Sequence, residues 1–139
     1  MAVVAELIRE ESNGTLSFGD YTLSDKTKMD GFEFGGDKYK VKTFNEITKL
    51  EKNGSFVYES VPGTAVFEFS ESDKQITFYV EGTVDSQVTV GLEASKEYKA
   101  YIGNVYEGKM KTNLGGKLNL SVELSEGERV LVRLEKVDE

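Results

Sequence analysis

The chain contains no histidine, no cysteine and no tryptophan, and it has one proline among its 139 residues. Without histidine or cysteine it cannot form a Cys/His zinc site, a thiol nucleophile or a serine–histidine triad. The absence of cysteine also removes any disulfide framework, which fits a reducing compartment. The absence of tryptophan removes the largest stacking surface available to a sugar-binding face. The composition therefore restricts both catalysis and sugar recognition.

Positive charge is scarce. The chain has 17 Lys+Arg against 25 Asp+Glu, a formal charge of −8, and its only arginines are Arg9, Arg129 and Arg133. This balance repels phosphate backbones, so we expect no nucleic-acid partner. No apolar run approaches the roughly 18 residues that span a bilayer, and the N-terminal sequence lacks the basic start of a signal peptide. We expect no membrane association and a cytoplasmic location, unless the chain is a fragment of a longer protein.

The dominant positive signal is the alternation of apolar and polar residues with period two, which is typical of half-buried β-strands. It is clearest over residues 117–124 and 130–135, which are separated by a short Gly-containing link and predict a hairpin. A second hairpin is predicted for residues 47–52 and 55–59, because Asn53-Gly54 between them suits a two-residue turn with positive φ.

Eight further segments have strand character and are separated by glycine-rich turns. They are Val3–Glu10, Thr15–Leu23, Lys38–Phe44, Thr64–Ser70, Gln75–Glu81, Gln87–Leu92, Glu97–Ile102 and Tyr106–Thr112. Residues 4–11 also have a weaker helical pattern. About ten short strands at this spacing predict one all-β domain over residues 1–139, an antiparallel β-sandwich of jelly-roll or Ig-like type. A calycin-like β-barrel is the alternative.

Carboxylates are the abundant side chains that could act as catalytic acids or bases. A glycosidase needs two of them on either side of the scissile bond, but 25 acidic residues supply candidate pairs everywhere. Glu68 lies between Phe67 and Phe69, although strand alternation directs it to solvent. The acidic loops match no EF-hand spacing. We therefore predict no catalytic residue, no metal site and no cofactor, and we expect that the protein is not an enzyme.

Three lysines recur at every second position. Lys38, Lys40 and Lys42 share one face of a predicted strand. Lysines on an edge strand discourage edge-to-edge pairing, and this is the favoured interpretation. The alternative is a patch for an anionic ligand on an otherwise acidic protein.

Two tyrosines are out of phase with the apolar alternation of their strands. Ile76, Phe78 and Val80 form the apolar series of one strand, which leaves Tyr79 on its outer side. Tyr101 lies outside in the same way on another strand, close to Lys99. Exposed tyrosine rings can stack on a sugar or pack against a partner protein. Tyr79, Tyr101 and Lys99 are therefore the predicted ligand-binding residues, and pairing across strands is the structural alternative.

The last 50 residues or so resemble the terminal β-sandwich domains of bacterial polysaccharide lyases and glycoside hydrolases. The positions that carry this resemblance are Leu92, Tyr98, Gly116, Leu118, Leu120 and Gly127. It implies an accessory β-sandwich module of a polysaccharide-active enzyme.

The whole chain resembles a group of short, uncharacterised proteins of anaerobic Firmicutes, some with a sialidase-type label. That label implies cleavage of sialic-acid polymers, but sialidases are longer propellers with Trp-containing repeats and an arginine cluster. This chain has no tryptophan, and its arginines lie near the two ends of the sequence. No catalytic residue is carried over.

Three functions are consistent with these observations. The leading one is a non-catalytic interaction or accessory module with a protein or carbohydrate partner. The second is a structural protein that assembles into homo-oligomers, which light scattering at micromolar concentration would refute by finding a monomer. The third is a small-ligand-binding barrel, which requires an enclosed apolar cavity.

Overall fold

The fold consists of two antiparallel β-sheets packed face to face. The structure is a computed structural model that describes residues 2–137. Its seven-stranded sheet contains, in spatial order, β1 (Ile8–Glu10), β2 (Leu16–Phe18), β7 (Ala65–Glu71), β8 (Gln75–Glu81), β13 (Val130–Lys136), β10 (Glu97–Ile102) and β11 (Val105–Lys111). Its six-stranded sheet contains β12 (Lys117–Val122), β9 (Ser86–Gly91), β6 (Ser55–Val61), β5 (Thr48–Lys52), β4 (Asp37–Thr43) and β3 (Thr27–Phe34).

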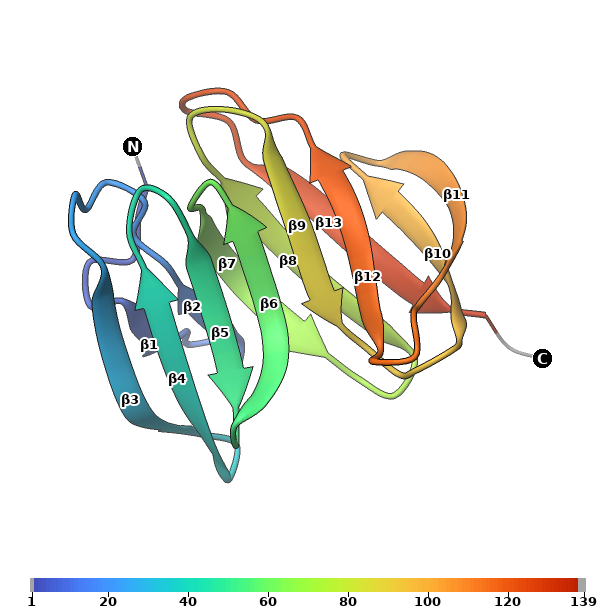
Figure 1. The fold of residues 1–139 in the computed structure, drawn as a ribbon, viewed down its shortest axis with the longest axis horizontal. Helices are drawn as coiled ribbons and strands as arrows, with labels where there is room; N and C mark the ends of the chain where they lie inside the picture. Colours follow the sequence, from blue (N-terminus) through green and yellow to red (C-terminus); the bar gives the residue numbers. More distant parts are fainter. Residues whose placement is uncertain (1, 138–139) are drawn as a thin grey trace.

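The six-stranded sheet lies in front in Figure 1, and the seven-stranded sheet lies behind it. At one side of the sandwich the short strand β1 contacts β3 of the opposite sheet. The predicted antiparallel sandwich is confirmed. No helix in the described part of the chain is long and apolar enough to cross a membrane.

The core lies between the two sheets and is filled with side chains. Its centre is a cluster of four aromatic rings, in which Phe18 and Tyr58 meet edge to face at 5.4 Å and Phe69 stacks on Phe78 at 5.6 Å. Such pairs add stability beyond the burial of their area. Each sheet has two free edges, so the sheets do not close into a barrel. The calycin-like alternative, with its enclosed ligand cavity, is therefore wrong.

One of the two predicted hairpins is present. Strands β5 and β6 pair directly, and Asn53 and Gly54 of their turn have φ values of 51° and 81°. The other prediction is wrong, because β12 pairs with β9 whereas β13 pairs with β8 and β10 in the opposite sheet. Period-two alternation identifies the buried face of each strand but not its neighbour, and residues 123–129 are long enough to cross between sheets roughly 10 Å apart.

Strand β3 was absent from the sequence prediction. It pairs with β4 in two halves, Met29 opposite Val41 and Phe32 opposite Tyr39. One extra residue therefore lies on β3 between these pairs, a bulge that contains Gly31 with a φ of 73°. A bulge shifts the alternation by one residue and hides the strand from a period-two search.

Buried hydroxyl groups form a network at one end of the sandwich. The Thr64 hydroxyl lies 2.8 Å from both the Tyr58 hydroxyl and the Ser60 hydroxyl. Thr48 donates a hydrogen bond of 2.7 Å to the Thr64 carbonyl oxygen, and its hydroxyl lies 2.8 Å from that of Thr43. All five residues are fully buried. Burial raises the pKa of Tyr58, so its hydroxyl stays neutral and its polarity is satisfied within the core.

Candidate functional site: the outer face of the seven-stranded sheet

The outer face of the seven-stranded sheet carries an aromatic and basic cluster at β13, β10 and β11. The pairing register places Thr77, Arg133, Tyr101 and Tyr106 side by side in one row that crosses β8, β13, β10 and β11. Neighbouring strands lie about 4.8 Å apart, so the row extends over roughly 14 Å. We call this row the tyrosine–arginine row.

Arg133 is the centre of this row. Its guanidinium carbon lies 4.3 Å from the centroid of the Tyr101 ring, which in turn lies 5.3 Å from the Tyr106 ring at an angle of 48°. The Arg133 Nε is buried and has no hydrogen-bond partner among the described residues, although it forms an ion pair with Glu135 Oε2 at 3.3 Å. Tyr106 is 51% exposed. The row thus combines a flat aromatic surface with a partly exposed guanidinium group.

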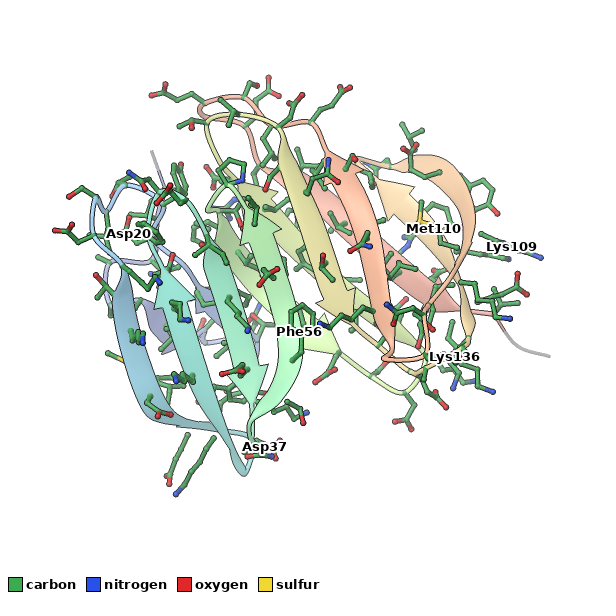
Figure 2. All side chains as sticks on the ribbon, viewed as in Figure 1. Asp20, Asp37, Phe56, Lys109, Met110 and Lys136 are labelled. Carbon is green, nitrogen blue, oxygen red and sulfur yellow. The ribbon has the colours of Figure 1, made fainter. Side chains whose placement is uncertain are left out.

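The predicted residue Lys99 lies beside this row. It faces Glu135 on β13 and Lys109 on β11, and Figure 2 shows Lys109 at the outer end of the sheet. Lys99 is half-buried and lies on the same face of β10 as Tyr101, two residues before it. Tyr101 and Lys99 belong to one surface.

Tyr79 is on the same face but in a different environment. It lies opposite Phe67 on β7 and Leu131 on β13, two strands away from Tyr101. Residues Ala2 and Val3 pack with it against a small second cluster. That cluster contains Val4, Tyr21, Ala65 and Phe67. Tyr79 therefore lies on the outer face as predicted, where it is half-buried against this cluster.

The three arginines are all on this side of the molecule, but they do not converge on one point. Arg129 stacks on Phe67 at 4.1 Å, and two of its nitrogens contact one carboxylate oxygen of the buried Glu81 at 2.8 Å. Arg9 joins it around a surface pocket of about 280 Å³. Arg133 lies apart from both, over Tyr101. The described residues contain no sialidase-like cluster of three arginines.

Carboxylates Glu11 and Glu68 line the same pocket as Arg9 and Arg129. A hydrogen bond of 2.5 Å from Ser17 and the proximity of Arg9 lower the pKa of Glu11. Glu68 occupies a bulge with a φ of 55° and accepts a hydrogen bond of 2.7 Å from Asn13. It is half-exposed between the buried Phe67 and Phe69, on the outer side that the alternation predicted. Arg9 and Glu11 pair with each other, Glu68 with Asn13 and Arg129 with Glu81, which is typical of a structural network.

A further pocket, of about 450 Å³, lies at an open end of the sandwich. It is bounded by the β7–β8 turn, the residues after β9, and the side chains of Tyr98 and Lys136. Lys136 pairs with Glu93 there, and the Tyr98 hydroxyl accepts a hydrogen bond from the Glu93 backbone. Its lining is polar and internally paired. Within residues 2–137 no group of three or more acidic side chains is close enough together to hold a metal ion.

Comparisons with models of protein families, with curated proteins and with solved structures find no match to this chain. The resemblance to accessory domains of polysaccharide-active enzymes and to short Firmicutes proteins therefore stays a prediction. Function is inferred here from the geometry alone.

Three residues of the row, Thr77, Arg133 and Tyr106, were not predicted as site residues. Tyr106 has the same parity as Met110 along β11, which assigns both to the core, but a bulge at Gly108 turns Tyr106 outward opposite Tyr101. Arg133 follows the alternation of β13, yet nothing in the sequence shows that β13 lies between β8 and β10. A search for outward arginines next to outward tyrosines would have identified Arg133 only with the strand order known.

Proposed function

We propose that this chain is a non-catalytic binding module that holds a carbohydrate on the outer face of its seven-stranded sheet. The observation that carries the proposal is the tyrosine–arginine row, in which two tyrosine rings and one guanidinium group form a continuous surface. No catalytic role is assigned to any residue.

Sugar rings have apolar faces of C–H groups and edges of hydroxyl groups, so a binding face needs flat rings beside hydrogen-bonding groups. Tyr101 and Tyr106 supply the rings, and their hydroxyls add polar contacts. The Arg133 guanidinium group is partly exposed, and Thr77 lies next to it in the row. Lys99 and Glu135 extend the polar surface along the neighbouring row. All these residues are on paired strands, so their backbone is already held in place before a ligand binds.

The test is affinity electrophoresis and glycan-array binding with the Tyr101→Ala/Tyr106→Ala double variant. If each ring contributes about 1 kcal/mol, the double variant should bind at least roughly tenfold more weakly than the wild type. Phe56→Ala is the matched control, because it removes an aromatic ring from the outer face of the opposite sheet. It should leave glycan binding unchanged.

Tyr79→Ala distinguishes the two predicted tyrosines. Since Tyr79 packs against the second cluster and lies two strands away from Tyr101, we expect a smaller loss of binding than for Tyr101→Ala, together with a loss of stability. Binding that is unaffected by the double variant, or no binding to any glycan on the array, would refute the proposed function.

A further inference from the structure

Five lysines gather on the outer face of the six-stranded sheet, four of them on β3, β4 and β5 and one just before β3. Lys28 lies directly opposite Lys42, and Lys42 lies directly opposite Lys49, so three lysines on three adjacent strands form one cross-strand row. Lys40 follows on β4, and Lys26 precedes β3 with its Nζ 5.9 Å from the Phe44 ring centroid. We call these five residues the lysine face. Figure 2 shows this side of the sheet turned toward the reader.

The charges of the lysine face are not neutralised within the described part of the chain. None of the five lysines is in an ion pair there. Glu51 lies opposite Lys40 and Glu59 opposite Lys49, but both cross-strand neighbours of Lys42 are lysines. Desolvation and the four other lysines lower the pKa of Lys42. Positive charge is therefore concentrated here in a protein whose formal charge is −8.

The structure removes the explanation that the sequence favoured for these lysines. Strand β4 is not an edge strand, since β3 and β5 pair with its two sides. Lys38, Lys40 and Lys42 therefore do not protect a free edge, and the edge-strand interpretation is wrong. Like charges directly opposite each other destabilise a sheet, by up to about 1 kcal/mol per pair. A row that opposes folding in this way is explained by an anionic partner that neutralises it.

We propose that the lysine face binds a linear acidic polysaccharide, whose carboxylate or sulfate groups pair with the lysines. The row has a lysine on each of β3, β4 and β5. Neighbouring strands lie about 4.8 Å apart, which is similar to the length of one sugar unit in a linear chain. Lysine is a compact charge on a flexible stem, so it does not require the planar geometry that arginine does.

The rest of this face favours a sugar chain over other polyanions. The row of Lys28, Lys42 and Lys49 continues through Glu59 to Thr89 and Asn119, whose side chains form a hydrogen bond of 2.7 Å. Gln87 and Ser121 make a similar amide–hydroxyl pair in the next row at 2.8 Å. Hydroxyl and amide groups of this kind hydrogen-bond to sugar hydroxyls.

Nucleic acid and lipid surfaces fit this face less well. Single-stranded nucleic acid is bound through aromatic rings that stack on its bases. Here Phe44 lies beneath Lys26, and Phe56 lies beneath Lys117 with Nζ 4.5 Å from the ring centroid. The lysine face contains no arginine and no exposed apolar side chain to enter a bilayer. Figure 2 shows Phe56 on β6, beyond the lysine face.

The experiment is biolayer interferometry with the full chain against immobilised heparin, polygalacturonate and uncharged dextran. Heparin presents sulfates and polygalacturonate presents only carboxylates, so these two probes identify the anionic group. We expect binding to at least one of them, no binding to dextran through this face, and an affinity that falls as salt rises.

The Lys28→Gln/Lys42→Gln/Lys49→Gln variant should bind roughly tenfold or more weakly, because three ion pairs of about 0.5 kcal/mol each are lost. It should also show a shallower salt dependence. The matched control is Lys74→Gln/Lys96→Gln/Lys111→Gln, which removes the same charge elsewhere. The control should keep most of the affinity, and circular dichroism checks that both variants fold.

Three results would overturn the proposal. The first is no binding to either acidic polysaccharide, and the second is an equal loss in both triple variants, which would indicate net charge alone. The third is equal or tighter binding to oligo-dT or to phosphatidylserine vesicles, which would assign the face to another class of polyanion. Tyr101→Ala/Tyr106→Ala should not change binding to the lysine face, so this proposal and the proposed function can fail separately.

Discussion

Thr64 provides the sharpest test of how this sandwich is stabilised. Its hydroxyl is the common partner of two other buried hydroxyls, those of Tyr58 and Ser60, each 2.8 Å away. Thr64→Val keeps the shape of the side chain and removes this partner. A buried polar group without a partner costs about 1–3 kcal/mol, so we expect the free energy of unfolding to fall by roughly 2–4 kcal/mol.

Tyr58→Phe should cost less, about 1 kcal/mol, because Thr64 keeps its contact with Ser60. In the double variant only Ser60 loses a partner, so the two effects should not add. Urea unfolding measures all three changes, and thermal melting should show a shift of roughly 3–4 °C per kcal/mol for a chain of this size.

Thr89→Val is the matched control, because Thr89 makes its hydrogen bond to Asn119 on the exposed face of β9. It should change stability by less than about 0.5 kcal/mol. If Thr64→Val lowered the unfolding free energy no more than this control does, the hydroxyl network would not be a stabilising element. Additive effects of Thr64→Val and Tyr58→Phe would show that the hydroxyls are not coupled.

Three further predictions concern charge and packing. The pKa of Glu11 is lowered in the folded protein, mainly by the hydrogen bond from Ser17. The stability that the Glu11 carboxylate contributes is therefore present above its unfolded pKa of 4.5 and is lost as the pH falls. Glu11→Gln should flatten the decline of the unfolding free energy from about pH 5 to pH 3. Lys42→Gln should raise stability by about 0.2–1 kcal/mol in low salt, and by less in concentrated salt. Gly91→Ala should lower the thermal midpoint, because the new Cβ lies 2.3 Å from the Phe56 carbonyl oxygen.

Each of these has a contrary outcome. If the unfolding free energy of Glu11→Gln falls at low pH as steeply as that of the wild type, other carboxylates cause the loss of stability in acid. A less stable Lys42→Gln protein in low salt would contradict repulsion within the lysine face. An unchanged melting temperature for Gly91→Ala would show that β6 and β9 can separate without cost.

Much of the fold and part of the candidate site follow from local patterns. The β5–β6 hairpin was predictable because Asn53-Gly54 satisfies a local backbone requirement. The outward orientation of Tyr101 was predictable because its strand alternates regularly. The orientation of Tyr106 and the existence of β3 were not predictable, because a single-residue bulge reverses the alternation of the residues beyond it. The pairing of strands that are distant in the sequence was not predictable either.

The amino-acid sequence by itself determined the chemistry that this protein lacks and the faces that most strands bury. Without histidine, cysteine or tryptophan, its functional groups are carboxylates, lysines, arginines and tyrosines, and alternation shows which of them lie outside. Only the tertiary structure decided which of them are neighbours. The strand order places Arg133 beside Tyr101. The pairing of β4 with β3 and β5 shows that its lysines lie inside a sheet and not at an edge. The physical reason is that side-chain alternation is local, whereas strand order depends on the packing of the whole chain.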